Sequence, residues 1–277
     1  MKKKFKLHLM KKLLVIISAC NEAASLKKFL PRLMKVVKGL HIPSTVLLIS
    51  DGSTDSTANV ALSNGCEVIN NSRNLGIGAS LKLGYKKAVD EDFDFVITLD
   101  ADGQHDETII PKVLSLLVKN EADIVVASRY HKNSERLGVP IDRDMLNISV
   151  TAQMRIITGW DITDPLSGFW GMTRPYFKFC LKNGKQNRYG IHLENLIKLW
   201  YLCDPRPRRI EIAHPAIYKN HGTLELLTRD YSSANQEQRV ERFGTHALHI
   251  LEALDDVRAI KEIDTEIQER LLGFRSQ

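Results

Sequence analysis

The sequence has few cysteines, and they are far apart. Its 277 residues contain four, Cys20, Cys66, Cys180 and Cys203. Small secreted domains held together by disulfides have a denser cysteine pattern, and a structural zinc site needs closely spaced pairs. The pattern therefore argues against both and favours a reducing compartment, so we expect a cytoplasmic protein.

The sequence also has no long apolar run. A membrane-spanning helix needs about 20 predominantly apolar residues, and no segment approaches that length. The apolar run at residues 13–17 is followed by Ser18, Ala19 and Cys20, which imitates a lipoprotein signal. The run is shorter than a signal core of about 7 to 15 residues, and we interpret it as a buried strand. Any membrane contact would then be peripheral, at the inner face of the membrane.

The excess of positive charge is local. Lys and Arg number 39 against 33 Asp and Glu, a net charge of +6. A basic arm at residues 1–12 holds six of the lysines: Lys2, Lys3, Lys4, Lys6, Lys11 and Lys12. Such an arm can attract anionic lipid headgroups, at about 1 kcal/mol per charge, or simply keep the terminus solvated. No helix-turn-helix, zinc-ligand or aromatic RNA-binding pattern accompanies it, so we expect no nucleic-acid partner.

Short apolar, β-branched runs alternate with longer segments of helical period between residues 13 and 127. This alternation is typical of a parallel sheet covered by helices. The predicted strands are residues 13–18, 45–49, 67–69, 95–99 and 124–127, and the predicted helices are 24–38, 54–64, 79–90 and 107–119. The sequence therefore predicts an α/β fold with a mostly parallel sheet flanked by helices.

The alternation weakens beyond about residue 140. A turn at residues 164–169 leads into a further short strand, and the pattern predicts a helix at 191–202 and a strand at 209–212. Residues 235–272 are charged and amphipathic, so we expect helices that pack on the core or on a partner. Whether the protein forms a homo-oligomer stays open. We divide the chain into the basic arm 1–12, a domain 13–230 with halves at about 13–130 and 131–230, and a helical tail 231–277.

Polar residues follow the predicted strands at their carboxyl ends. They are Asn21-Glu22, Ser50-Asp51-Gly52-Ser53, Asp100-Ala101-Asp102 and Ser128-Arg129. In open parallel sheets, ligands bind in the crevice at the carboxyl ends of the strands. These four loops should therefore converge on one ligand site.

Asp100-Ala101-Asp102 is the segment with the clearest chemistry. In an extended segment, residues i and i+2 face the same way, so both carboxylates can point at one hard cation such as Mg²⁺ or Mn²⁺. Gln104 and His105 follow closely enough to extend such a site. The alternative is that the two aspartates only cap a helix or stabilise a turn.

Three further loops add candidates for phosphate and nucleotide contacts. Asp51 lies nearest the end of its strand, although the residues after it can all serve as helix caps. Gly76, in a glycine-containing loop that opens a helix, suits the close approach of a nucleotide. Arg129 can pair with phosphate or be an ordinary surface arginine.

Together these segments carry a resemblance to a known family. Residues 15–22, Ile49-Ser50-Asp51-Gly52-Ser53-Thr54-Asp55, Asn74-Leu75-Gly76, residues 99–105, Ala127-Ser128-Arg129 and Ser167-Gly168-Phe169 occur in the order typical of family 2 glycosyltransferases. Over residues 13–170 the chain resembles the branch with dolichyl-phosphate mannosyltransferases and other polyprenyl-phosphate sugar transferases. Beyond residue 185, Tyr189–Glu194 and Lys219–Leu224 resemble glucosyl-3-phosphoglycerate synthases, which glycosylate a soluble acceptor.

The resemblance implies a GT-A fold and a set of donor-binding residues. The nucleoside would lie among Ser18, Cys20, Glu22, Ser50 and Asp51. Asp100, Ala101, Asp102 and Gln104 would meet the metal and the sugar diphosphate, with Gly76 nearby, and Arg129 would meet phosphates or the acceptor. The family usually has a proline and an aromatic residue where Ser18 and Cys20 stand, so a UDP-linked and a GDP-linked donor both stay open.

The expected reaction is a metal-dependent transfer with inversion. A carboxylate pair that binds metal, without a second strong nucleophile, fits a single displacement at the anomeric carbon. We expect Asp102 to be essential, His221 to be a third metal ligand or a surface residue, and Glu194 to be either the base for a hydroxyl acceptor or a charge that favours the helix dipole. A hydroxyl of a soluble or cell-envelope molecule is the expected acceptor group, and a polyprenyl phosphate at the membrane surface is the alternative.

Two other functions rank lower. A nucleotidyltransferase would need a glycine-rich phosphate loop near the first strand, and residues 13–24 contain no glycine. A sugar-nucleotide-binding module without catalysis would not need Asp100 and Asp102.

Overall fold

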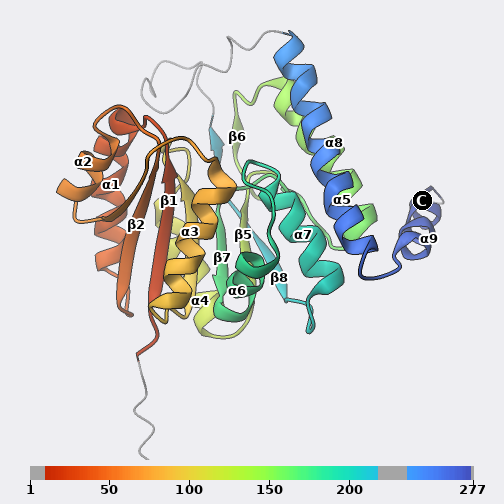
Figure 1. The fold of residues 1–277 in the computed structure, drawn as a ribbon, viewed down its shortest axis with the longest axis horizontal. Helices are drawn as coiled ribbons and strands as arrows, with labels where there is room; N and C mark the ends of the chain where they lie inside the picture. Colours follow the sequence, from red (N-terminus) through yellow and green to blue (C-terminus); the bar gives the residue numbers. More distant parts are fainter. Residues whose placement is uncertain (1–9, 218–235, 276–277) are drawn as a thin grey trace, which may run out of the picture.

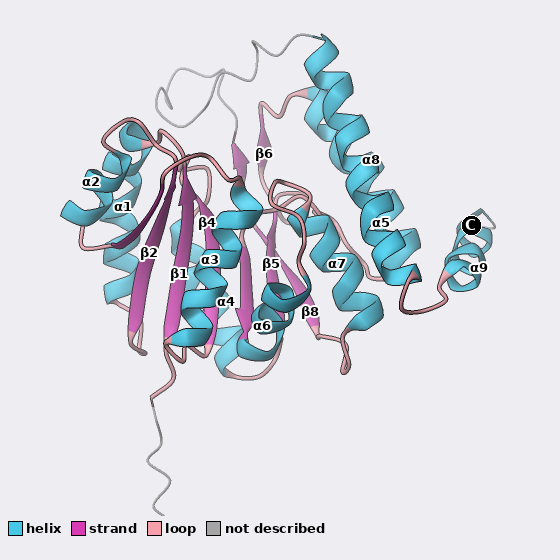
Figure 2. Ribbon diagram, in the orientation of Figure 1, coloured by secondary structure: helices cyan, strands magenta, loops and turns pink. Residues whose placement is uncertain are grey.

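The protein is described by a computed structural model at residues 10–217 and 236–275. Its centre is a seven-stranded sheet in the order β3-β2-β1-β4-β7-β5-β8 (Figure 1, Figure 2). The strands are β1 Leu13–Ala19, β2 Ser44–Asp51, β3 Glu67–Asn71, β4 Phe95–Asp100, β5 Ile124–Ser128, β7 Trp170–Thr173 and β8 Arg209–Ala213. Only β7 runs antiparallel to its neighbours within this sheet. The predicted mostly parallel α/β fold is confirmed.

β1 lies in the interior of the sheet, between β2 and β4. Every residue from Leu13 to Ile17 is completely buried, because helices cover both faces of a parallel sheet and its inner strands are apolar throughout. The segment that imitates a lipoprotein signal is therefore a core strand of the fold.

Helices cover both faces of the sheet (Figure 1). One face carries α1 Ala23–Lys38, α2 Thr57–Ser63 and α4 Ile110–Val118, which follows the short 3₁₀ helix η1 Glu107–Ile109. The other face carries α3 Ile77–Asp90, α6 Arg174–Asn183 and α7 Ile191–Leu202. Each face buries its own apolar cluster, as the layered architecture requires. The carboxyl ends of β1 and β2 point to the top of Figure 1.

Three helices lie beyond α7, away from the sheet. They are α5 Ile141–Thr158, α8 Gln236–Arg258 and α9 Asp264–Arg275, and a small sheet pairs β6 Arg136–Leu137 with β9 Ala216–Ile217. On α8, Ile250, Ala253 and Val257 are buried in the same apolar cluster as residues of α7. The helices expected in the tail therefore pack on the core.

Two helices were not predicted, α5 and α6. The apolar residues of α5 are divided between a buried side and an exposed one, since Val150 and Met154 are buried while Met145 and Ile148 are exposed. This division weakens the helical period in the sequence. None of the helices at residues 10–217 and 236–275 combines the length and apolar content that a membrane span requires.

Candidate active site

A cleft of about 620 Å³ opens at the carboxyl ends of β1, β2, β4 and β5. Most of the predicted donor-binding residues line it: Ser18, Cys20, Glu22, Asp51, Gly76, Asp100, Ala101, Asp102, Gln104 and Arg129. The fold brings these side chains together because parallel strands end at the same edge of the sheet.

Ser50 does not reach this cleft. It is buried within the sheet, where β2 pairs with β1 and β3, and it is 3% exposed. Side chains alternate along a strand, so Ser50 follows Leu48 onto the face covered by α1 and α2. The predicted nucleoside contact of Ser50 is therefore not supported by its position, whereas the next residue, Asp51, lines the cleft.

The predicted donor-binding residues form one side of the cleft, which we call the donor side. Asp51 shapes this side by holding a loop in place. Its carboxylate accepts hydrogen bonds from the Asn71 side chain at 2.8 Å, from the Leu75 backbone at 2.9 Å and from the Gly76 backbone at 2.7 Å. Gly76 has a φ of 97°, and a Cβ there would lie 2.3 Å from the carbonyl oxygen of Asn187. Only glycine fits this backbone and this close approach.

Asp100 and Asp102 lie at the end of β4 in surroundings that disfavour their charge. Burial raises the pKa of both carboxyl groups, and the nearby charge of Asp100 raises the pKa of Asp102 further. A bound cation would relieve this repulsion. A Cβ at Gly168 would lie 2.9 Å from Oδ1 of Asp100, so the glycine leaves room for the carboxylate.

The residues fit a divalent cation as a partial ligand set. Two carboxylates are the oxygen ligands that Mg²⁺ and Mn²⁺ accept. The buried Nε2 of Gln104 has no hydrogen-bond partner among the described residues; it is a donor and would suit a phosphate oxygen, not the cation. Within residues 10–217 and 236–275, no group of three or more His, Cys, Asp or Glu could hold a metal ion. Oxygens of a bound diphosphate would have to complete the shell. His221, the predicted third ligand, lies outside the described residues.

His105 supports Asp100 from behind the cleft. Its Nδ1 accepts a hydrogen bond from the Asp100 backbone at 3.0 Å, and its Nε2 lies 3.5 Å from Oδ2 of Asp100. Burial lowers the pKa of His105 to about 4, so the ring is neutral at pH 7. It packs against Phe169 and His214. His105 therefore orients the end of β4 and does not line the cleft.

Arg129 is held in place by Asp164, a residue that the sequence did not reveal. The guanidinium donates two hydrogen bonds to the carboxylate, at 2.8 and 2.9 Å, and the Arg129 backbone donates a third at 3.0 Å. Asn147 donates another at 3.0 Å. Burial alone would raise the pKa of Asp164, but the charge and hydrogen bonds of Arg129 outweigh it and lower that pKa. Arg129 is thus a fixed cation in the cleft, and the surface alternative does not apply.

The distal side of the cleft comes from parts of the chain far from the donor loops. It is lined by Asp142, Arg143, Leu146, Asn147, Arg188, Tyr189, His192 and His246. None of these was predicted as a site residue. Burial lowers the pKa of His192 to about 4, so its imidazole is neutral at pH 7. Together with Arg129 on the other side, Arg143 and Arg188 give the cleft three arginines.

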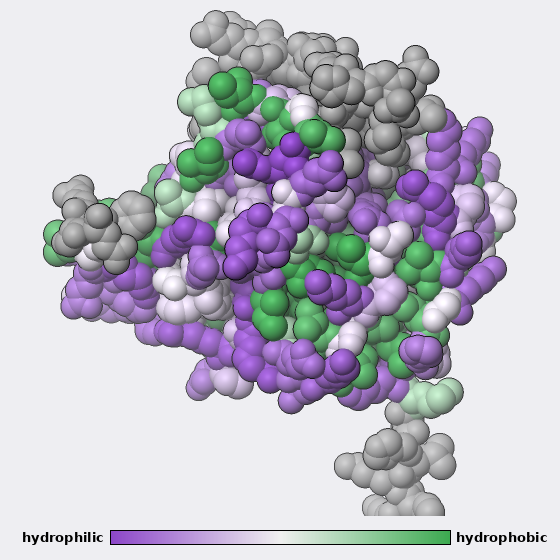
Figure 3. All heavy atoms as spheres, turned by 180° about the vertical axis from the view of Figure 1, so that it is seen from behind, coloured by the Kyte–Doolittle hydropathy of each residue, from purple (hydrophilic) through white to green (hydrophobic). Residues whose placement is uncertain are grey.

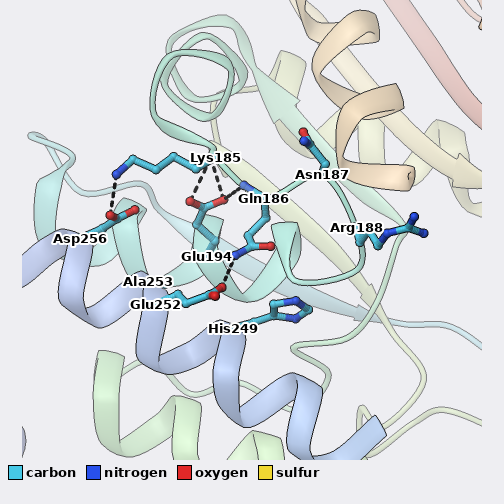
Figure 4. Close-up of a pocket in the computed structure, with 9 residues that line it drawn as sticks. All are labelled: Lys185, Gln186, Asn187, Arg188, Glu194, His249, Glu252, Ala253 and Asp256. Atoms are coloured by element: carbon cyan, nitrogen blue, oxygen red, sulfur yellow. Dashed lines mark hydrogen bonds and ion pairs between the residues drawn. The ribbon is translucent and has the colours of Figure 1, made fainter. Parts of the chain in front are cut away.

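Glu194 does not line this cleft. It is 1% exposed and lines a neighbouring pocket of about 410 Å³ (Figure 4). Its carboxylate accepts hydrogen bonds from the Lys185 backbone at 2.9 and 3.0 Å, from the Gln186 backbone at 2.9 Å, and from Lys198 at 2.6 Å. A base must reach the proton of the acceptor, so these contacts do not support the predicted role of Glu194 as a base.

Two sugar transferases named for dolichol phosphate are similar to this chain in sequence. A dolichyl-phosphate N-acetylglucosaminyltransferase of Methanococcus voltae that uses UDP-N-acetylglucosamine is 26% identical over 200 residues, which cover 66% of this chain and 78% of that protein. A dolichol-phosphate mannosyltransferase of Saccharomyces cerevisiae is 25% identical over 248 residues, 84% of this chain and 89% of that one.

A solved structure has the same fold. Glucosyl-3-phosphoglycerate synthase of Mycobacterium tuberculosis, in complex with Mn²⁺ and UDP-glucose, matches with a TM-score of 0.62 at 17% identity, covering 91% of this chain and 80% of that chain. The fold is therefore of the GT-A type.

The family itself follows from a sequence profile. The profile described as "Glycosyl transferase family 2" matches residues 14–181. This range spans more than half of the chain and includes the loops at the ends of β1, β2, β4 and β5. The chain belongs to glycosyl transferase family 2.

Proposed function

We propose that this glycosyltransferase moves a sugar from a nucleotide-diphosphate sugar to an acceptor with the help of Mg²⁺ or Mn²⁺. The observation that carries the proposal is the pair Asp100 and Asp102 beside Arg129 in one cleft. Burial raises the pKa of both carboxyl groups, and a bound cation would stabilise their charged forms.

Some residues of this chain would bind the cation, and others would position the phosphates and the nucleoside. Asp100 and Asp102 would hold the cation, which neutralises the charge that develops on the leaving diphosphate. Arg129, fixed by Asp164, would contact phosphate oxygens from a preorganised position. Ser18, Cys20, Glu22 and Asp51 would surround the nucleoside. A single displacement with inversion of the anomeric carbon stays our proposal.

The donor would be linked to UDP or GDP. The Methanococcus voltae relative is named for UDP-N-acetylglucosamine, and the Mycobacterium tuberculosis structure holds UDP-glucose. We therefore give UDP-linked hexoses and N-acetylhexosamines the first place in the assay, and GDP-mannose the second.

We propose an acceptor that carries a phosphate group. Arg129, Arg143 and Arg188 line the cleft, and a second anion beside the donor diphosphate is consistent with three cations. If an acceptor phosphate itself attacks, it is already ionised and needs no base, which agrees with the position of Glu194 outside the cleft. If a hydroxyl attacks, His192 is an imidazole that lines the cleft, but burial lowers its pKa to about 4, which makes it a weak base for that proton.

A polyprenyl phosphate is the second candidate for the acceptor, and α5 supplies the observation that favours it. Ile141, Met145 and Ile148 are 76%, 59% and 62% exposed, at helical spacing. Four residues between them line the cleft: Asp142, Arg143, Leu146 and Asn147. Figure 3 views the molecule from behind and shows apolar side chains at the upper left, over α5. A lipid chain bound there would leave its phosphate at the cleft.

One assay separates these possibilities. Purified protein is incubated with UDP- and GDP-sugars and with Mn²⁺, Mg²⁺ or EDTA, in the presence of phosphoglyceric acid or a short polyprenyl phosphate. We expect metal-dependent release of a nucleoside diphosphate, UDP or GDP, and a glycosylated product with one of the two acceptor classes. In a parallel reaction with a nucleoside triphosphate and a sugar 1-phosphate, release of pyrophosphate would indicate a nucleotidyltransferase. Donor binding without turnover would indicate a binding module.

A further inference from the structure

One short segment, residues 184–190, separates two cavities. Arg188 and Tyr189 line the cleft, whereas Lys185 and Gln186 line the pocket between this segment and α8, and Arg188 lines both. We call residues 184–190 the connecting segment. A displacement of its backbone would move two side chains of the cleft.

The connecting segment rests on the donor side of the fold. The Ala79 backbone at the start of α3 donates to the Asn187 carbonyl at 3.1 Å. Lys82 donates to the Asn187 side chain at 2.7 Å and to the Lys185 carbonyl at 3.2 Å. A Cβ at Gly78 would lie 2.6 Å from the Gln186 carbonyl oxygen. This tight packing fixes the segment from one side only.

The buried carboxylate of Glu194 holds the backbone of the connecting segment. This carboxylate receives the backbone N–H groups of Lys185 and Gln186, so the path of the backbone at this point depends on one buried side chain. Lys198, 4% exposed in its side chain, lies one helical turn further along α7 and pairs with Glu194 at 2.6 Å. A buried carboxylate of this kind needs such a partner.

The pair continues to α8. Lys198 Nζ also contacts Asp256 at 2.7 Å, and Asp256 receives Lys185 Nζ at 2.5 Å. Gln186 donates to Glu252, also on α8, at 2.6 Å (Figure 4). The contacts form a chain from Asp256 through Lys198 and Glu194 to the backbone of the connecting segment.

We propose that Glu194, Lys198 and Asp256 are positioning residues, through which α8 sets the place of Arg188 and Tyr189 in the cleft. This inference rests on the proposed function. None of the three residues lines the cleft, so they act through the connecting segment. Their effect should fall on substrate binding, because the residues that hold the cation and the donor diphosphate are not in the chain of contacts.

The matched test compares two neighbouring aspartates of α8. Asp256→Asn removes the charge that pairs with Lys198 and Lys185. Asp255→Asn is the control, because Asp255 pairs only on the surface with Arg258, at 3.0 Å, and exposed pairs contribute little. We expect Asp256→Asn to raise the KM of donor or acceptor about three- to tenfold, with kcat within about twofold of the wild type. Asp255→Asn should leave both unchanged.

A second variant protects the test against a folding defect. Glu252→Ala removes the exposed end of the Gln186 contact and should raise the same KM by a smaller factor, without a change in thermal midpoint. If Asp256→Asn does not fold, Glu252→Ala decides. A wild-type KM for both substrates in the variants that fold would overturn the proposal.

Hydrogen exchange separates this proposal from the proposed function. Amides of residues 185–190 should exchange faster in Asp256→Asn than in the wild type, while amides of β1 and β4 should not change. This result requires no turnover, so it stands even if no nucleotide sugar proves to be a substrate. Unchanged exchange at residues 185–190 would overturn the positioning role independently of the reaction.

Discussion

The two sides of the cleft differ in how their residues arrive there. On the donor side, Asp51, Asp100 and Arg129 directly follow or end strands of one sheet. On the distal side, Arg143, Arg188 and His192 come from α5, the connecting segment and α7, which are held by contacts between helices. The first side is positioned by backbone pairing, the second by side-chain packing. Substitutions should therefore act differently on the two sides.

The largest effect is expected on the donor side. Asp102→Ala should lower kcat about 10²- to 10³-fold, in the range found for the loss of one group that stabilises developing charge. The thermal midpoint should stay close to that of the wild type, because Asp102 is not part of the apolar core. The measurement is turnover at saturating donor over a series of Mn²⁺ concentrations. Metal-dependent donor affinity at the wild-type level would contradict the role of Asp102.

An intermediate effect is expected at Asp164, which joins the two sides through Arg129 and Asn147. Asp164→Asn removes the negative charge that pairs with the Arg129 guanidinium but keeps an acceptor oxygen, and hydrogen bonds to charged groups contribute about 1.5 to 3 kcal/mol. Urea unfolding should report a decrease of that size. The matched control is Asp161→Asn, which removes an exposed partner of Arg155. Equal stability of the two variants would show that the Arg129–Asp164 pair contributes no more than a surface pair.

The smallest effect concerns pH and His214. Burial lowers the pKa of His214 to about 3, so the folded protein keeps the ring neutral while the unfolded chain takes up a proton below its pKa of about 6.5. The stabilising contribution is full above pH 6.5 and is lost as the pH falls towards the folded value.

Between pH 7.5 and 5.5, one such histidine lowers the unfolding free energy by about 1.4 kcal/mol. His214→Gln keeps an acceptor for the Asp106 backbone N–H, which lies 3.0 Å from Nε2, and does not titrate. The pH dependence of urea unfolding should therefore be weaker in this variant by about that amount. An unchanged dependence would mean that His214 is accessible to protons in the folded state.

The sequence predicted the donor side well because strand ends carry positional information. A residue that follows a buried apolar run in a parallel sheet must emerge at one edge, so Asp100, Asp102 and Arg129 could be placed together without coordinates. Ser50 shows the limit of this reasoning. Its neighbour Asp51 faces the cleft, and a change of one position along a strand reverses the face.

The distal side could not be predicted in the same way. Glu194 and His192 stand two residues apart at the start of α7, and two helical positions differ by about 200°. His192 therefore faces the cleft and Glu194 faces the connecting segment. The choice between them depends on where α3 and α8 pack, which no local pattern records. The role of Asp164 as the partner of Arg129 could not be predicted for the same reason, because Arg129 and Asn147 are distant from it in sequence.

The antiparallel strand β7 has a consequence for the order of folding. β4 and β5 do not pair with each other, since β7 lies between them. Residues up to Thr173 must therefore be in place before the strand that ends in Asp100 acquires its second neighbour. Such long-range pairings are slow to form, and an incomplete chain would expose the edge of β4 to other chains. We expect the pairing of β7 with β4 and β5 to be the folding step that joins β1 to β4 and β5 in one sheet.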